Sequence, residues 1–133
     1  MNKFSGQIAK VSVEGQLSVV DVNCSGVMFK AIMLETPESF TELVPSRAVN
    51  VLIKETEIVL TPEPNPVISM RNRVRGPIKR IDEGQLLCSV VIDTEIGEVE
   101  SVITRNAVKE LALTQGSKVT ALIKTNEVML SFD

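Results

Sequence analysis

The chain contains an internal repeat, which is the feature that most limits its possible folds. Residues 49–60 return as residues 119–130 with nearly the same order of residue types, an offset of 119 − 49 = 70 positions, and Asn2 falls on Asn72 at the same offset. A unit of this length is too long for a solenoid repeat and suits a small β module. The sequence therefore predicts two similar modules, although 133 residues alone would suggest one domain.

Both halves show the periodicity of half-buried β-strands. Val27, Phe29, Ala31 and Met33 alternate with other residues in the first half, and residues 95–98 have the composition of a hairpin turn in the second. About five short strands and one short helix are expected in each half. The predicted fold class is mainly β, with two tandem OB-like β-barrel modules that each carry one short helix.

The expected helices and the linker divide the chain. A helix is predicted at residues 36–40, where Thr36 precedes a proline, and another at residues 104–111. Three prolines alternate in residues 62–66, which is typical of a stiff, extended connection. The predicted organisation is a divergent first module at 1–61, a Pro-rich linker at 62–68 and a second module at 69–133. We expect the last short strand of each half to complete its own module. Because halves of this size bury little core, we also expect them to stabilise one another or the protein to oligomerise.

Composition excludes several classes of function. The chain has 14 basic and 17 acidic residues, which argues against nucleic acid or an anionic membrane as a partner, and it has no apolar run that could span a bilayer. It has no histidine, and its carboxylates are scattered, so we expect no catalytic residues, no metal site and no enzyme. Two cysteines at non-equivalent positions and no signal-peptide pattern near the start favour a cytoplasmic location.

Hydrogen-bond donors gather at two places in the second half. The segment Ser69–Asn72 and the pair Lys124–Thr125 offer hydroxyl, amide, guanidinium and ammonium groups. A fully deprotonated tetrahedral oxyanion requires such a set of donors. A plainer interpretation remains open, because a lysine at a strand end is often a solvated residue that discourages edge-to-edge aggregation.

Two further polar stretches have alternative interpretations. Residues 104–107 could form an anion seat at a helix N-terminus or simply cap the helix. A basic run could follow a single-stranded nucleic acid, but it has no interleaved aromatic side chain, so a solvated strand face is the favoured interpretation. This run comprises Arg71, Arg73, Arg75, Lys79 and Arg80.

The second half resembles the molbindin family, whose modules are also called Mop or TOBE domains. Residues 69–72, followed by Gly76, resemble the Ser-Ala-Arg-Asn…Gly opening of that family. Residues 118–124 resemble its closing strand, and residues 102–111 resemble the stretch between them. Through the repeat the resemblance extends to residues 2–61, so the chain is similar to a two-module molbindin.

The resemblance implies an OB-like fold that binds molybdate or tungstate in the cytoplasm without a cofactor. It also implies oligomers with sites between neighbouring modules, here a trimer of two-module chains. In the family, the Ser-x-Arg-Asn segment of one module meets a lysine of another. The residues implicated by position are Ser69, Met70, Arg71, Asn72, Thr104, Lys124 and Thr125, with Lys54 as the equivalent lysine of the first module.

The first module departs from the family pattern. Glu55 follows Lys54 where a small residue is usual, Glu35 lies in the stretch that usually carries a threonine, and no serine precedes Asn2. In the second module Ala107 replaces a usual serine. We therefore expect the first module to keep the scaffold and to contribute only part of a site, through Lys54.

Three functions remain open from the sequence. The leading hypothesis is storage or buffering of molybdate or tungstate by reversible binding. A second is an oxyanion-sensing module that acts on a partner protein, and a third is a structural oligomer whose sites have decayed. The sequence does not distinguish molybdate from tungstate, because the two ions have nearly equal size and charge.

Overall fold

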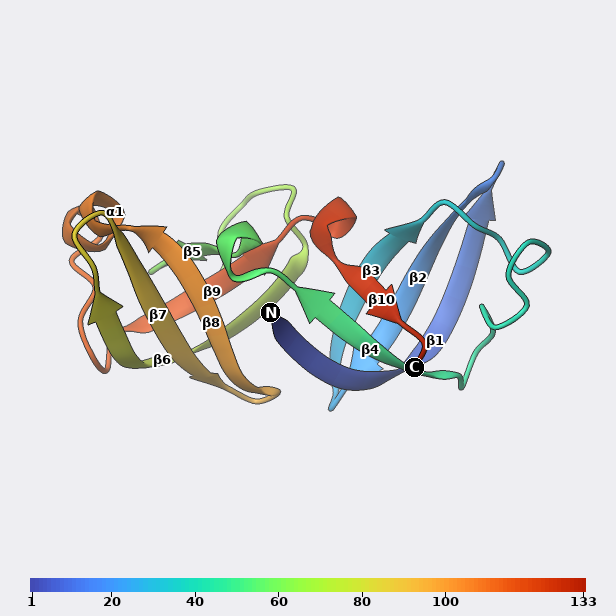
Figure 1. The fold of residues 1–133 in the computed structure, drawn as a ribbon, viewed down its shortest axis with the longest axis horizontal. Coiled ribbons are helices and arrows are strands. Elements are labelled where there is room, and N and C mark those ends of the chain that lie inside the picture. Colours follow the sequence, from blue (N-terminus) through green and yellow to red (C-terminus); the bar gives the residue numbers. More distant parts are fainter.

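The structure is a computed structural model that describes all residues, 1–133, and contains two five-stranded antiparallel sheets (Figure 1). This confirms the predicted mainly β fold with two modules. The first sheet is built largely from four strands of the first module: β1 (Asn2–Glu14), β2 (Leu17–Cys24), β3 (Val27–Met33) and β4 (Ala48–Ile53). The second is built largely from four strands of the second module: β6 (Asn72–Glu83), β7 (Leu87–Thr94), β8 (Gly97–Thr104) and β9 (Lys118–Ile123).

The fifth strand of each sheet comes from the other module. Strand β5 (Val59–Thr61) pairs with β9, and β10 (Met129–Ser131) pairs with β4, so that the strand orders are β10-β4-β1-β2-β3 and β5-β9-β6-β7-β8. Figure 1 shows β10, in red, lying in the sheet of the first module. The expectation that each short last strand completes its own module is wrong. The division at residues 1–61 and 69–133 stays a prediction about chain segments, because the two sheets share those segments.

The exchanged strands join the modules into one hydrophobic core. Twenty-five buried residues form a single cluster that includes members of both modules. Phe132, which follows β10, packs edge-on against Phe40 of the first module with 4.8 Å between ring centroids. Arg47 donates a hydrogen bond of 2.8 Å to the Phe132 carbonyl. The C-terminal segment therefore stabilises the first module through side chains as well as strand pairing.

Helical structure is sparse and differs between the modules. Helix α1 (Arg105–Glu110) forms where a helix was predicted, and Thr104 accepts a hydrogen bond of 3.1 Å from the Ala107 amide as its N-cap. Residues 36–40 form only one turn, which a 2.8 Å hydrogen bond from the Phe40 amide to the Thr36 carbonyl closes, and no further helical turn follows. The helical turn of the first module is instead the 3₁₀ segment η1 (Glu55–Glu57), which η2 (Thr125–Glu127) repeats in the second. No helix is long and apolar enough to cross a membrane.

Candidate functional site

Most of the predicted site residues lie at the end of the second sheet where β6 begins and β9 ends. We call this row of strand ends, and its equivalent in the first module, an edge. In the antiparallel pairing, Asn72 lies opposite Ile123, so the segment that leads into β6 and the segment that leaves β9 are neighbours. Arg71 and Lys124 are the next residues outward, and both are exposed and form no ion pair. The resemblance implied that such a segment meets the lysine of another module. Within one chain, Arg71 and Lys124 flank the Asn72–Ile123 pair at neighbouring strand ends of the second module.

Two arginines of β6 position the segment that carries Ser69 and Met70. Arg73 donates hydrogen bonds of 3.1 Å to the Pro66 carbonyl and 2.6 Å to the Met70 carbonyl. Arg75 donates 3.2 Å to the Pro62 carbonyl and 2.8 Å to the Thr120 hydroxyl. These contacts hold the linker along the sheet, and Arg73 brackets the residues that immediately precede Arg71. Residue spacing alone did not reveal this positioning role.

The basic run is mostly engaged within the chain. Arg73 and Arg75 bind carbonyls of the linker, Lys79 pairs with Glu98, and Arg80 pairs with Asp82. The Glu98 hydrogen bond raises the pKa of Lys79, and the same bond lowers the pKa of Glu98. Arg71 alone among the five forms no hydrogen bond or ion pair. The arrangement supports the interpretation of a structural strand face and leaves Arg71 as the free cation of the run.

Asn72 joins the two modules instead of projecting into solvent. Its side-chain oxygen accepts a hydrogen bond of 2.7 Å from the Lys30 amide in β3, and its side-chain nitrogen donates 2.9 Å to the Lys30 carbonyl. At the offset of 70, Asn2 makes the same pair of bonds, both 2.8 Å, with the main chain of Glu100 in β8. Each asparagine therefore ties the first strand of its module to the third strand of the other. The repeat revealed the equivalence of Asn2 and Asn72 but not this contact.

Thr104 lies away from this edge. It ends β8 opposite Leu87, at the far end of the second module, whereas Asn72 begins β6 at the junction between the modules. Its hydroxyl caps α1. Thr104 therefore reaches an oxyanion held near Lys124 only if the residue comes from another copy of the chain.

The equivalent edge of the first module contains Lys54 beside the start of β1. Asn2 lies opposite Ile53, so Met1 and Lys54 are the next residues outward. Glu55 stands where the second module has Thr125, and it forms an ion pair with the amino group of Met1. A carboxylate at this position opposes a bound anion, which supports the expectation that this edge offers only part of a site.

No surface pocket of the chain is lined by Arg71 or Lys124. The candidate edge is therefore open in a single chain. No group of three or more metal-ligating side chains occurs. The chemistry at the edge is thus cationic and rich in donors, without a carboxylate among Ser69–Asn72 and Lys124–Thr125.

Comparisons with known proteins identify the family of the chain. A sequence profile of the TOBE domain matches residues 68–130. Molybdenum-pterin-binding protein 1 of Clostridium pasteurianum is 33% identical over 64 residues, which cover 47% of this chain and 94% of that protein. The probable molybdenum-pterin-binding protein of Haemophilus influenzae is 37% identical over 67 residues and 97% of its own length.

Two longer relatives match both modules. The molybdenum transport protein ModE of Azotobacter vinelandii is 26% identical over 132 residues, and this chain spans about half, 49%, of its length. The structure of the cytoplasmic molybdate-binding protein ModG with molybdate bound superposes with a TM-score of 0.91 at 27% identity, over 99% of this chain and 96% of ModG. The sequence matches and the two-module fold show that this chain belongs to the molbindin family, as a tandem of two Mop/TOBE modules.

Proposed function

We propose that the chain binds molybdate or tungstate at sites completed between modules of a homo-oligomer, and that it stores or buffers the oxyanion in the cytoplasm. The family consists of binding proteins rather than enzymes. The reaction is reversible binding without bond chemistry. Relatives named for molybdenum or molybdate binding, and the extensive similarity to ModG, support the choice of ligand.

The observation that carries the proposal is that Arg71 and Lys124 flank the Asn72–Ile123 pair at neighbouring strand ends. Neither side chain has an acidic partner, and the segment before Arg71 is held by Arg73. Charge-assisted hydrogen bonds from such groups are the strong ones in anion recognition. The Ser69 hydroxyl and nearby main-chain amides extend the same donor set.

The open edge supports a second copy of the chain as part of each site. A dianion held tightly must exchange its water shell for protein donors, and one chain leaves this edge exposed. Thr104, on the other hand, sits at the far end of the same module. A closed oligomer, a trimer of two-module chains, would bring such distant residues to one ligand. Native mass spectrometry with and without molybdate measures the oligomer and its number of bound ions.

The donor set also predicts selectivity. Hydrogen phosphate would place its O–H against a donor, and an unmatched buried group costs about 1–3 kcal/mol, or roughly one to two decades of affinity. Sulfate is fully deprotonated, so only its smaller size disfavours it. The expected order of affinity is tungstate close to molybdate, then sulfate, then hydrogen phosphate. Displacement of molybdate by phosphate at similar concentration would contradict a donor-only site.

Calorimetry with matched lysine variants tests the proposal. Lys124→Ala should weaken molybdate binding about 10- to 100-fold, because a hydrogen bond to a charged group contributes about 1.5–3 kcal/mol. Lys118→Ala removes an exposed lysine at the other end of the same strand and should change binding little. Lys54→Ala should have a smaller effect than Lys124→Ala. Equal, negligible losses in all three variants would favour the structural oligomer with decayed sites.

A sensing role is the second candidate, because this chain matches only 49% of the longer protein ModE, so two such modules also occur joined to further segments. In that case molybdate would change the affinity of the chain for a partner protein. Hydrogen exchange with and without molybdate separates the two roles. A store should become protected only around the edge that contains Lys124, whereas a sensor should change protection on a surface away from it.

A further inference from the structure

The linker crosses the second sheet on its way to the edge that contains Arg71. Strands β5 and β6 run in the same direction on either side of β9, so the chain has to return past β9 between them. It leaves β5 at Thr61, opposite Thr120, and enters β6 at Asn72, opposite Ile123. The course of the linker over β9 therefore decides where the segment that leads into β6 lies.

The linker is packed against the face of β9 that points away from the hydrophobic core. Leu122 is 2% exposed although it is not part of the core cluster, and Thr120 on the same face is also 2% exposed. At the offset of 70, Leu52 and Asn50 of the first module are only half-buried. The Thr120 hydroxyl donates a hydrogen bond of 2.7 Å to the Glu63 carbonyl. The linker is thus a fixed strap across the strand rather than a free connection.

Arg73 holds the end of this strap that is next to the candidate site. Its guanidinium group donates 3.1 Å to the Pro66 carbonyl and 2.6 Å to the Met70 carbonyl. The peptide bond between Met70 and Arg71 is trans, so its N–H points away from the carbonyl that Arg73 binds. The Arg71 amide makes no hydrogen bond within the chain. Arg73 therefore fixes a main-chain donor that is directed away from itself and is free for a ligand.

The first module has no such clamp. Lys3 stands at the position of Arg73, is exposed and forms no ion pair. Ser5 replaces Arg75, and its hydroxyl donates a hydrogen bond of 3.3 Å to the Asn50 side chain. A lysine ammonium is a compact charge on a flexible stem, whereas the planar fork of an arginine spans two carbonyls. This difference between the two edges is separate from their difference in carboxylates.

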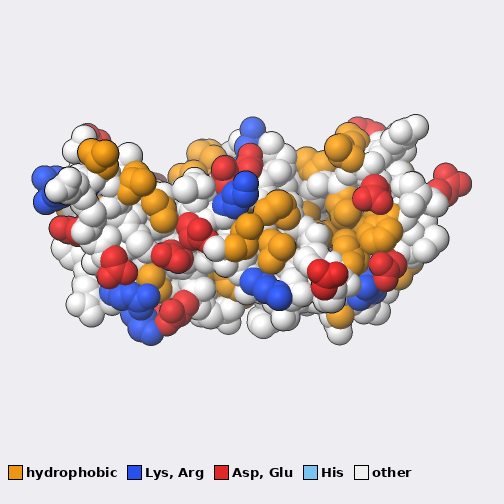
Figure 2. All heavy atoms as spheres, viewed as in Figure 1, with side chains coloured by type: hydrophobic (Ala, Val, Ile, Leu, Met, Phe, Trp, Pro, Cys, Tyr) orange, Lys and Arg blue, Asp and Glu red, His pale blue; other side chains and the backbone are white.

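Positive charge alone does not mark a site for an oxyanion on this molecule. Figure 2 shows Lys and Arg side chains at several places on one face, several of them beside acidic side chains. Strong binding also requires donors that are already held in place, because ordering them during binding lowers the affinity. The clamp by Arg73 supplies that order at one edge.

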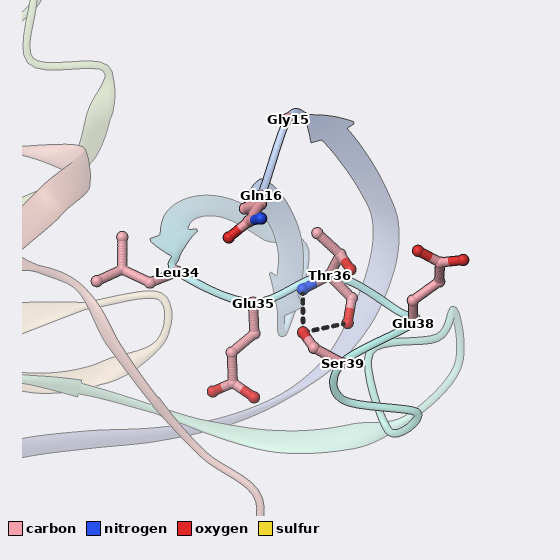
Figure 3. Close-up of a pocket in the computed structure, with 7 residues that line it drawn as sticks. All are labelled: Gly15, Gln16, Leu34, Glu35, Thr36, Glu38 and Ser39. Carbon is pink, nitrogen blue, oxygen red and sulfur yellow. Dashed lines mark hydrogen bonds between the residues drawn. The ribbon is translucent and has the colours of Figure 1, made fainter.

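The pocket at the far end of the first module offers no alternative seat for an oxyanion. It lies between the β1–β2 turn and the segment that follows β3, and its lining includes the carboxylates of Glu35 and Glu38 (Figure 3). The Ser39 hydroxyl in this pocket already donates 3.2 Å to the Thr36 carbonyl and accepts 2.9 Å from the Thr36 amide. An anion there meets two carboxylates and an occupied hydroxyl.

We propose that Arg73 is a positioning residue of the oxyanion site and that the linker is part of that site. By holding the Met70 carbonyl, Arg73 keeps the Ser69 hydroxyl and the Arg71 amide in place before the ligand arrives. Folding rather than binding then orders these donors, which increases the affinity. Arg73 acts through the segment that it holds and not by touching the oxyanion. The inference rests on the proposed function and adds to it a residue outside the donor set.

Calorimetric titration of the full chain with sodium molybdate separates positioning from charge. Arg73→Gln removes both the fork of donors and the positive charge, whereas Arg73→Lys keeps the charge and loses the fork. We expect each variant to weaken binding about tenfold, because the segment then has to be ordered during binding. Arg80→Lys changes an exposed arginine of the same strand and should leave binding unchanged. Wild-type affinity in Arg73→Lys would overturn the inference, because charge alone would then suffice.

A double-mutant cycle separates positioning from a general loss of stability, and circular dichroism verifies that each variant is folded. If Arg73 acts through the segment that it holds, the Ser69 hydroxyl contributes less once the clamp is removed. The factor by which Ser69→Ala weakens molybdate binding should therefore be about threefold smaller in the Arg73→Lys background than in the wild type. A purely structural role leaves that factor unchanged, so equal factors in the two backgrounds would overturn the inference.

Amide NMR spectra of the chain without molybdate provide a readout that does not depend on the ligand. Arg73→Lys should displace the amide resonances of Met70 and Arg71, and Arg75→Lys, which loosens the linker only at Pro62 and Thr120, should displace them less. Unchanged resonances in Arg73→Lys would overturn the inference even if the wild type binds molybdate. Displaced resonances in a chain whose wild type does not bind molybdate would instead overturn the proposed function, and with it the role of the clamp in binding.

Discussion

The two edges at the module junction have the same architecture and different chemistry. Asn2 and Asn72 make equivalent hydrogen bonds to the third strand of the opposite module. Around these shared contacts, the second edge presents Arg71 with Thr125, whereas the first pairs the amino group of Met1 with Glu55. The contacts that hold the modules together are thus repeated, while the charged groups beside them have diverged.

The divergence assigns different roles to the two edges. The segments Ser69–Asn72 and Lys124–Thr125 of the second edge contain no carboxylate, so an anion held by them meets only donors. At the first edge the Glu55 carboxylate partly neutralises the positive charge of Lys54, and it repels a bound anion. Two copies of one scaffold can therefore differ in affinity without any change in fold, because the scaffold depends on buried residues and the affinity on exposed ones.

The largest expected effect tests whether either module is independent. Separate chains of residues 1–61 and 69–133 each lack the strand that the other module supplies, so neither should fold as a monomer. The second fragment can recover a fifth strand by exchanging β10 with another copy, and its unfolding midpoint should then rise with concentration. Urea unfolding at several protein concentrations measures this. A monomeric fragment with a sharp, concentration-independent transition would show that the exchanged strand is dispensable.

Replacement of the two asparagines compares the shared contacts. Asn72→Ala should lower the free energy of unfolding by about 2–4 kcal/mol, because it leaves the Lys30 amide and carbonyl without partners. Asn2→Ala should have a similar effect through Glu100. Asn50, whose side chain accepts an exposed hydrogen bond of 3.3 Å from Ser5, is a suitable control. If Asn2→Ala and Asn72→Ala lower the free energy of unfolding no more than Asn50→Ala does, the contacts of Asn2 and Asn72 do not stabilise the junction between the modules.

Exchange of the residues after the two lysines tests the difference in chemistry. Thr125→Glu should weaken molybdate binding about tenfold or more, since it places a carboxylate beside Lys124. Glu55→Thr should strengthen binding at the first edge or add a site there. Calorimetric titration reports both affinity and number of sites. Unchanged binding in both variants would mean that these positions do not contact the ligand.

The smallest expected effect concerns an ion pair found only in the second module. Because Lys79 lowers the pKa of Glu98, the stabilisation from this carboxylate is present above its ordinary pKa, about 4.3, and is lost as pH falls through the lower folded value. The pKa of Lys79 is raised instead, so the stability that its ammonium group contributes is present at neutral pH. That stability is lost only at high pH, as the pH rises through the pKa of Lys79 in the folded protein. Both groups are exposed, so Glu98→Gln should shift the melting temperature only slightly. A large shift at neutral pH would show that the pair matters more than solvent screening allows.

Much of the local structure was predictable from residue patterns. The alternation in β3, the hairpin turn before Gly97 and the cap of α1 by Thr104 all depend on neighbours in the sequence. The predicted helix at 36–40 was wrong because the chain makes a single turn there, from the Phe40 amide to the Thr36 carbonyl, and does not continue into a second turn.

The site was predictable only in part. Resemblance named Ser69–Asn72 and Lys124, and the register of β6 against β9 places Arg71 next to Lys124. The contacts of Asn72 with Lys30 cross between modules, so no local pattern could reveal them. The hydrogen bond from Arg73 to the Met70 carbonyl depends on how the linker lies against the sheet. The spacing of residues along the sequence does not specify that position.

The sequence by itself determined that the protein has two similar β modules, that its core is mostly aliphatic and that donors gather around Lys124. These properties follow from the repeat, the apolar alternation and residue identity, all of which can be read along the chain. Only the tertiary structure decided that β5 and β10 exchange sheets and that Asn2 and Asn72 each bind the third strand of the opposite module. The physical reason is that either short strand could pair with either equivalent edge. The choice between them depends on how the whole chain packs rather than on the residues of the strand.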